Sequence, residues 1–136
     1  MPERFYRINN KENTVIVRNP TRGCLLVFFS DIGGRYGMSF SELFNTVGDL
    51  PASIVFMQDP QKLWFHLGIK GIGGTIETVA QYVKHLAVRE DTKRIITAGY
   101  SGGGYAAILM GMLAGADEVH AFGPQTRLLQ RRDSRY

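Results

Sequence analysis

Residues 94–113 read RIITAGYSGGGYAAILMGML, and this stretch decides the fold that the sequence predicts. A short run rich in β-branched residues ends at Gly99, Ser101 stands between Gly99 and Gly103, and an apolar helix-forming segment follows at once. The pattern predicts a strand, a sharp turn and a helix, with the serine in a strained backbone conformation and its hydroxyl exposed at the end of a sheet. Only very small side chains fit two residues before and after such a serine, and both positions are glycine.

The short motif by itself is a weak signal, because G-x-S-x-G occurs by chance in about one chain in twenty of this length. A glycine-rich phosphate loop is the alternative, but it requires G-x-G-x-x-G or G-x-x-x-x-G-K-[ST], and residues 99–104 match neither pattern. The strand before the serine and the helix after it favour a nucleophile elbow. In that geometry the backbone N–H of Gly102 points to where an oxyanion would form above the Ser101 oxygen.

The composition indicates a single domain spanning residues 1–136. Of these residues 44% are hydrophobic, which is enough for one core. We expect residues 1–13 to form a polar N-terminal arm and residues 126–136 to form a basic C-terminal tail. The only cysteine, Cys24, excludes a disulfide framework, suits a reducing compartment and is expected to be a buried structural thiol.

Charge and hydropathy patterning argue against a membrane or nucleic-acid partner. The N-terminal residues 1–7 are charged with no apolar core behind them, so no signal peptide is predicted, and no apolar run approaches the ~20 residues of a membrane span. We therefore expect a cytoplasmic protein. The net charge is +4, but four arginines lie within residues 127–136, which predicts a solvated tail rather than a nucleic-acid-binding face.

Strand and helix signals alternate along the chain. We expect strands at residues 14–18, 24–30, 53–57, 94–99 and 118–122, and helices at residues 40–47, 75–88 and 103–114. Ser39 and Glu42 form a capping-box pattern before the first helix, and the turn-rich residues 19–23 predict a hairpin connection. The alternation predicts an α/β fold, a three-layer αβα sandwich with a mostly parallel sheet of about five strands.

The motif and its surroundings resemble a known family. The segment GYSGGGYAA (99–107), the helix end AGAD (114–117) and VHAFGPQ (119–125) look like the elbow, the following helix and the next strand of an α/β-hydrolase domain. The resemblance extends more loosely over residues 14–125. It implies a serine hydrolase or acyltransferase core in which the strand at 53–57 lies beside that at 24–30, followed by those at 94–99 and 118–122. Residues 14–18 would then add an antiparallel edge strand.

The resemblance also implies that part of the catalytic machinery is missing. In the family the acid and the histidine follow strands beyond the last one found here, and only 35 residues follow Ser101. We therefore expect an α/β-hydrolase-like core that lacks its last strands. The family's arrangement implies two oxyanion donors, the backbone N–H of Gly102 and a backbone N–H at Asp31 or Ile32.

A long loop at residues 61–74 supplies the candidate base. His66 lies in this loop, which leaves the same sheet edge as Ser101 and is a candidate lid. Asp59, and less specifically Asp31, end strands at that edge and could orient a base, although both are also turn formers. Of the other histidines, His85 is expected to be a surface residue and His120 a structural residue on a sheet face.

Apolar residues of the loop are expected to cover the Ser101 pocket, because a glycine-hinged loop at that edge leaves them nowhere else to bury. These are Trp64, Phe65 and Leu67. Tyr100, directly before the serine, is expected to belong to the same substrate pocket or lid. The sequence shows no metal-ligand pattern and calls for no cofactor.

Two functions remain open. The first is a serine esterase, thioesterase or acyltransferase that forms an acyl-enzyme at Ser101 and takes its missing groups from His66 or from a partner chain. The second is a non-catalytic binding or interaction domain with an incomplete triad. In the first case a small acyl or ester compound is the substrate. We also expect a homo-oligomer formed through the edge of the last strand, since an unpaired strand edge invites pairing with another chain.

Overall fold

Strand β3 (Cys24–Phe29) lies at the centre of a six-stranded sheet in the computed structural model, which describes residues 5–9, 14–18, 23–69 and 71–125. Its residues alternate between the two sheet faces, and Leu25, Val27 and Phe29 are fully buried. Parallel neighbours flank β3 on both sides, β4 (Ser53–Met57) on one and β5 (Arg94–Tyr100) on the other. The apolar run that begins at Cys24 is therefore a central strand, as the sequence predicts.

The remaining strands extend this centre in both directions. The sheet order is β1-β2-β4-β3-β5-β6, in which β4, β3, β5 and β6 are parallel and the other two strands are antiparallel. The bounds of these other strands are Phe5–Asn9 (β1), Thr14–Arg18 (β2) and Glu118–Phe122 (β6). The predicted neighbours of the four parallel strands are confirmed.

The N-terminal strands of the sheet differ from two predictions, the polar arm and the hairpin. Phe5–Asn9, placed by the sequence in a polar arm, forms β1 and pairs antiparallel with β2. The sheet thus has six strands rather than about five. Strand β2 pairs with β4, so residues 19–23 do not connect a hairpin. The physical reason is that β3 already has a parallel neighbour on each side, which leaves the outer side of β4 as the available edge.

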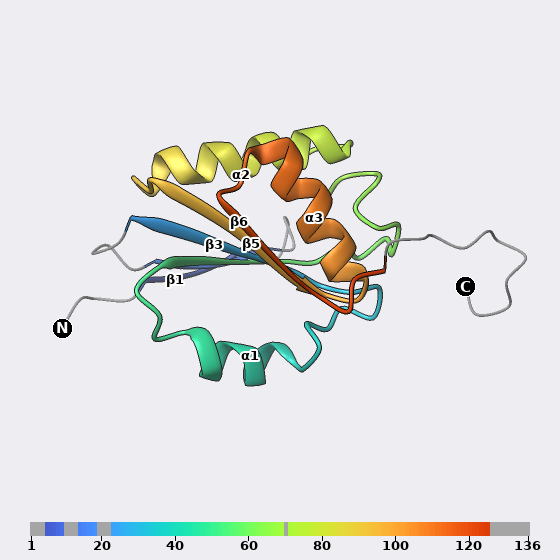
Figure 1. Ribbon diagram of the computed structural model, residues 1–136, viewed down its shortest axis with the longest axis horizontal. Helices are drawn as coiled ribbons and strands as arrows, with labels where there is room; N and C mark the ends of the chain where they lie inside the picture. The colour runs from blue at the N-terminus through green and yellow to red at the C-terminus, as the bar shows by residue number, and fades with distance from the viewer. Residues whose placement is uncertain (1–4, 10–13, 19–22, 70, 126–136) are drawn as a thin grey trace, which may run out of the picture.

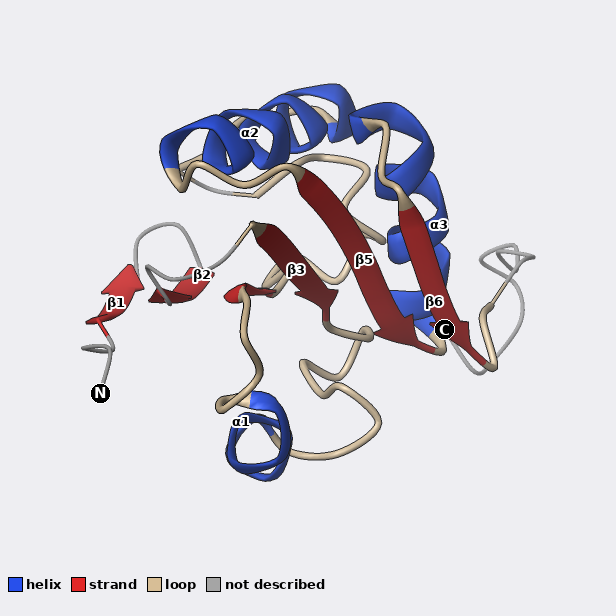
Figure 2. Ribbon diagram, turned by 60° about the vertical axis from the view of Figure 1, so that its left-hand side comes forward, coloured by secondary structure: helices blue, strands red, loops and turns tan. Residues whose placement is uncertain are grey.

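Helices cover both faces of the sheet and complete three layers (Figures 1 and 2). Helix α1 (Phe40–Val47) packs on one face, and α2 (Ile76–Arg89) and α3 (Gly102–Ala114) pack together on the other. Odd-numbered β3 residues face the α2–α3 cluster and even-numbered ones face the α1 cluster. The α/β three-layer fold is confirmed.

Local capping fixes where two of the helices begin. The Ser39 hydroxyl oxygen accepts a hydrogen bond from the Glu42 N–H (3.2 Å) and donates to the Glu42 carboxylate (3.0 Å). Thr75 and Thr78 form a reciprocal capping box at α2. These contacts satisfy backbone donors that a helix leaves free at its N-terminus.

The order of connections creates a crevice at one edge of the sheet. From β3 the chain passes through α1 to β4 on one side, whereas from β5 it passes through α3 to β6 on the other side. The carboxyl ends of β3 and β5 are neighbours, and the segments that follow them diverge. Ligands of open parallel sheets bind at such a switch point, and Ser101 follows β5 there.

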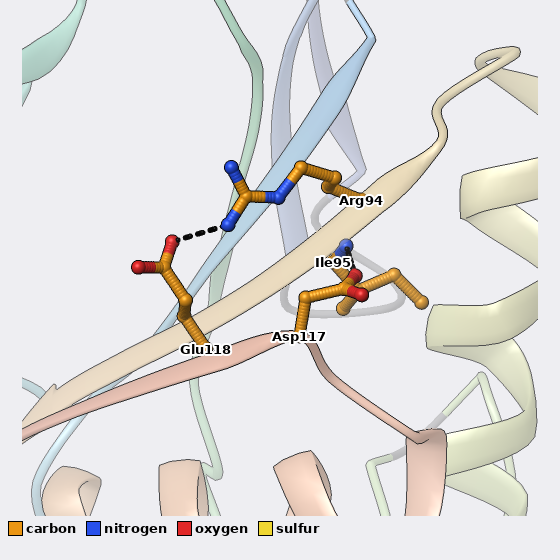
Figure 3. A network of polar contacts seen from close by, with 4 residues as sticks. All are labelled: Arg94, Ile95, Asp117 and Glu118. Carbon is orange, nitrogen blue, oxygen red and sulfur yellow. Dashed lines mark hydrogen bonds and ion pairs between the residues drawn. The ribbon is translucent and has the colours of Figure 1, made fainter.

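Polar contacts hold β5 and β6 together at the opposite edge (Figure 3). Arg94 donates to the Glu118 carboxylate at 2.9 Å, and the Ile95 N–H donates to Asp117 Oδ2 at 2.8 Å. Because the Arg94–Glu118 pair is exposed, its stabilisation is modest, about 0–1 kcal/mol. These contacts help set the register in which Tyr100 lies beside Phe122 at the site's edge.

An apolar groove of about 620 Å³ lies between α1 and the sheet face formed by β5 and β6. Tyr100, His120 and Phe122 line it from the sheet, and Met38 and Leu43 line it from the α1 side. His120 is thus on a sheet face, as expected, but it is exposed.

Self-association through β6 stays a prediction, now with a defined surface. No other described strand pairs with the outer edge of β6, and Val119 and Phe122 on this strand are 40% and 60% exposed. A two-fold pairing of β6 with its copy would satisfy the backbone groups and cover apolar area. We expect sedimentation at micromolar concentration to show a dimer and Phe122→Asp to shift it to monomer. A wild-type monomer of about 15 kDa would contradict this prediction.

Candidate active site

Ser101 occupies the sharp turn between β5 and α3, with φ 55° and ψ −116°. A non-glycine residue in such a conformation costs about 1–3 kcal/mol and persists only when its surroundings impose it. Here the Ser101 N–H donates to the Phe122 carbonyl at 3.0 Å, and the Ser101 carbonyl accepts from the N–H groups of Tyr105 (3.1 Å) and Gln125 (3.0 Å). The backbone on both sides of the serine is therefore held in place.

Two glycines allow the turn to pack this tightly. A Cβ atom added to Gly99 would collide with the Gly103 carbonyl, and one added to Gly103 would collide with the Phe29 carbonyl at the end of β3. Both collisions involve backbone atoms, which cannot move aside cheaply. The two positions therefore require glycine, for the reason that the sequence pattern suggests.

Two backbone donors meet beside this turn. The position of a Cβ atom on Gly102 lies 3.6 Å from the Ile32 nitrogen, so the start of α3 and the segment after β3 are in contact. Neither the Gly102 N–H nor the Ile32 N–H forms a hydrogen bond within the described residues. The other predicted donor is occupied, because the Asp31 N–H donates to the Arg35 carbonyl at 2.7 Å. Of the two alternatives, only Ile32 offers a free donor.

Trp64 packs against Gly102 beside these donors. Its ring atom Cζ3 is 3.0 Å from the Cβ position of Gly102, and its ring packs edge-on against Tyr105 with centroids 5.9 Å apart. A crevice of about 10 Å³ remains beside it, lined by Ser30, Ile32 and Gly102 among others. The loop that carries Trp64 thus reaches the sheet edge where Ser101 lies.

The other two apolar residues of the loop do not form a cover with Trp64 as expected, although Phe65 also lines the crevice. Phe65 is 2% exposed and packs edge-on against Phe29 in the core, with ring centroids 5.4 Å apart. Leu67 is 56% exposed. The reason is the backbone: Trp64 and Phe65 both have positive φ, so the turn sends successive side chains in different directions. Tyr100 lines the large apolar groove instead of the crevice.

Asp59 holds this loop and does not orient a histidine. Its carboxylate, on a residue only 7% exposed, accepts hydrogen bonds from the N–H groups of Gln61 (3.0 Å), Leu63 (2.9 Å) and Phe65 (2.9 Å). These bonds span the segment in which three non-glycine residues have positive φ, namely Lys62, Trp64 and Phe65. A charged acceptor with three partners offsets the strain of those conformations.

His66 is paired with a tyrosine that the sequence analysis missed. Its Nε2 lies 2.6 Å from the Tyr105 hydroxyl. Burial raises the pKa of Tyr105, so the phenol keeps its proton at neutral pH and can donate a hydrogen bond to His66 Nε2. In the tautomer that accepts at Nε2, the one ring N–H is at Nδ1. Tyr105 follows Ser101 by four residues, and this helical spacing, which places residues on one helix face, is the signal that could have identified it.

The remaining candidates lie away from the turn. His85 is exposed on α2, as expected. Cys24 is a partly buried free thiol at the amino end of β3, and burial raises its pKa, which disfavours the reactive thiolate. Within the described residues, no group of three or more histidine, cysteine or acidic side chains could hold a metal ion. In the same part of the chain, no helix combines the length and apolar character needed to cross a membrane.

A solved structure shares this architecture. The chain is similar to MGS-MChE2, an α/β hydrolase enzyme from the metagenome of sediments from the lagoon of Mar Chica, Morocco, with a TM-score of 0.55 and 15% identity. The match covers 89% of this chain and 52% of that one. Brefeldin A esterase, a bacterial homologue of human hormone sensitive lipase, matches with a TM-score of 0.49 and 14% identity over 85% of this chain and 35% of that one.

The chain therefore has the α/β-hydrolase fold. It spans about half the length of MGS-MChE2. At this level of identity the likeness shows the fold alone. No family model matches the sequence, and no curated protein matches it. The chemistry must accordingly be argued from the site itself.

The role of Asp59 can be tested through Trp64, the only tryptophan in the chain. We expect Asp59→Ala to lower the free energy of unfolding by about 3 kcal/mol, since it leaves three N–H groups without their charged acceptor. Trp64 emission should also shift to the red as the loop loosens. Glu77→Ala, on the exposed first turn of α2, is the control and should cost less than about 1 kcal/mol. An unchanged Trp64 emission in Asp59→Ala would show that other contacts hold the loop.

Proposed function

We propose that this chain is a serine acyl hydrolase core that forms an acyl-enzyme at Ser101, with a small ester or thioester as substrate. An esterase, a thioesterase and an acyltransferase share this first step. One observation carries the proposal: a serine in a strained turn, φ 55°, stands next to two adjacent backbone N–H groups that have no partner among the described residues. Strain of this kind clusters at functional sites.

The first step follows from these positions. The Ser101 oxygen bonds to the acyl carbon as a base takes the hydroxyl proton, and the electron pair of the carbonyl bond moves to its oxygen. The N–H groups of Gly102 and Ile32 would then bind the resulting oxyanion, as a nucleophile elbow requires. Preorganised donors of this kind stabilise the transition state without reorganising during the reaction. When the carbonyl re-forms, the C–O or C–S bond of the substrate breaks, and the alcohol or thiol leaves with the proton that the base took up.

Transfer of the Ser101 proton to a base is expected to be the slow step of the reaction. His66 is the histidine on the loop that covers the turn, but its Nε2 is engaged by Tyr105. It can take the serine proton only after that hydrogen bond breaks. Asp59, which could have oriented it, is bound to three backbone N–H groups. We therefore expect turnover to be slow, with the oxyanion donors and substrate binding as the main contributions to rate.

The second candidate is a non-catalytic binding domain with the same fold. The engagement of His66 and Asp59 favours it, because no described carboxylate then orients a base toward Ser101. In this alternative the crevice beside Trp64 binds a small anion without chemistry. The two candidates differ in one property, the reactivity of the Ser101 hydroxyl.

A fluorophosphonate probe measures that reactivity directly, because it labels only activated serines. We expect the probe to label the wild type at one site per chain and Ser101→Ala not at all. Ser39→Ala, which removes the partly buried helix-capping serine of α1, is the matched control and should be labelled like the wild type. Equal labelling of wild type and Ser101→Ala would place the reactive serine elsewhere, and no labelling of either would favour the binding domain.

The pairing of His66 with Tyr105 predicts opposite effects for two substitutions. Tyr105→Phe removes the hydroxyl and frees His66 Nε2, so the rate of labelling should rise. His66→Ala removes the base, and the rate should fall by about tenfold or more, since general bases contribute about 10²–10⁴-fold. A His66→Ala variant that labels at the wild-type rate would mean that the proton goes to another group, such as one on a partner chain.

A further inference from the structure

Ser30 carries the only buried side-chain polar atom that lacks a hydrogen-bond partner among the described residues. The residue is 1% exposed and lies immediately after β3. Leaving a buried hydroxyl unsatisfied costs about 1–3 kcal/mol of stability. Because an alanine there would avoid this cost, the hydroxyl calls for an explanation.

The position of Ser30 suggests that its hydroxyl binds a ligand. Ser30 lines the crevice of about 10 Å³ beside Trp64, together with Ile32 and Gly102. The latter two residues carry the free backbone N–H groups at the switch point of the sheet. Asp31 and Asp59 also line it, but backbone N–H groups of the loops already donate to both carboxylates. Three residues that each carry a donor without a partner among the described residues thus line one small space.

The size of the crevice limits what it can accept. A space of about 10 Å³ holds no more than one water-sized sphere. Trp64 closes the space over Gly102, and the Phe29–Ser30 backbone is packed against Gly103 on its inner side. The crevice therefore suits one oxygen atom, and a donor set of this kind favours an oxygen that carries negative charge.

We propose that the Ser30 hydroxyl is a third donor of the oxyanion site, acting with the N–H groups of Gly102 and Ile32 on a single anionic oxygen. The ligand is the oxygen of a tetrahedral acyl intermediate or of a carboxylate product. This inference rests on the proposed function, because it assigns Ser30 to the step in which Ser101 attacks the acyl carbon. The hydroxyl donates its hydrogen bond and keeps its proton throughout, while the serine proton passes to the base.

The backbone around Ser30 supports this role. Its N–H donates to the Met57 carbonyl at 2.9 Å, which ties the end of β3 to β4. A Cβ atom on Gly103 would lie 3.1 Å from the Ser30 carbonyl carbon, so the first turn of α3 also packs against this residue. Ser30 is therefore held between β4 and the first turn of α3, which carries Gly102, and its hydroxyl needs little reorganisation to bind an oxyanion.

Ser30→Ala separates this role from a structural one because the two predict different results. The rate of Ser101 labelling by the fluorophosphonate should fall by about tenfold or more, since removing one oxyanion donor typically costs about 10²–10³-fold. The midpoint of urea unfolding should stay the same or rise, because the unsatisfied hydroxyl is gone. Ser53→Ala is the matched control: Ser53 is 2% exposed but lies at the amino end of β4, and its loss should leave labelling unchanged.

A second measurement does not depend on reactivity at Ser101. Acetate titrated into the ¹⁵N-labelled protein should shift the amide signals of Gly102 and Ile32, and Ser30→Ala should weaken the apparent affinity several-fold. If the wild type is not labelled but these shifts occur, the proposed catalysis fails while the anion site stands. If Ser30→Ala is labelled at the wild-type rate, the third donor is refuted and the proposed function stands. No labelling and no acetate shift in the wild type would overturn both.

Discussion

The close approach of the first turn of α3 to the end of β3 is the contact on which the rest of the site depends. Gly103 packs against the Phe29 carbonyl and Gly99 against the Gly103 carbonyl, with no room for a side chain at either position. This contact forces Ser101 into its strained turn and brings the Gly102 and Ile32 N–H groups together. A helix start displaced outward would relax the serine and separate the donors.

In the loop after β4, the carboxylate of Asp59 stabilises the backbone conformation and takes no part in proton transfer. Asp59 stands where a catalytic acid could stand, at the carboxyl end of a strand, yet backbone N–H groups occupy both of its oxygens. Its hydrogen bonds stabilise a turn with three left-handed residues, and that turn sets Trp64 over Gly102. The chemistry beneath the loop thus depends on a carboxylate that need not touch the substrate.

The fold and the site carry different kinds of information about this protein. Four parallel strands with helices on both faces place the chain among α/β-hydrolase structures, although it spans 52% of the length of MGS-MChE2. Proteins of one fold perform many functions, so the fold by itself assigns none. The proposed activity rests on Ser101 and the free donors around it. The apolar groove beside β6 is a separate feature, lined by Tyr100 but not by Ser101.

The sequence alone determined the features that depend on residues close together in the chain. The apolar strands, the Ser39–Glu42 cap and the glycines around Ser101 were predictable because each signal is local. Tertiary structure decided the rest: the pairing of β2 with β4, the use of Asp59 by the loop and the hydrogen bond between His66 and Tyr105, 39 residues apart. Such contacts depend on how distant segments pack, which local patterns do not encode.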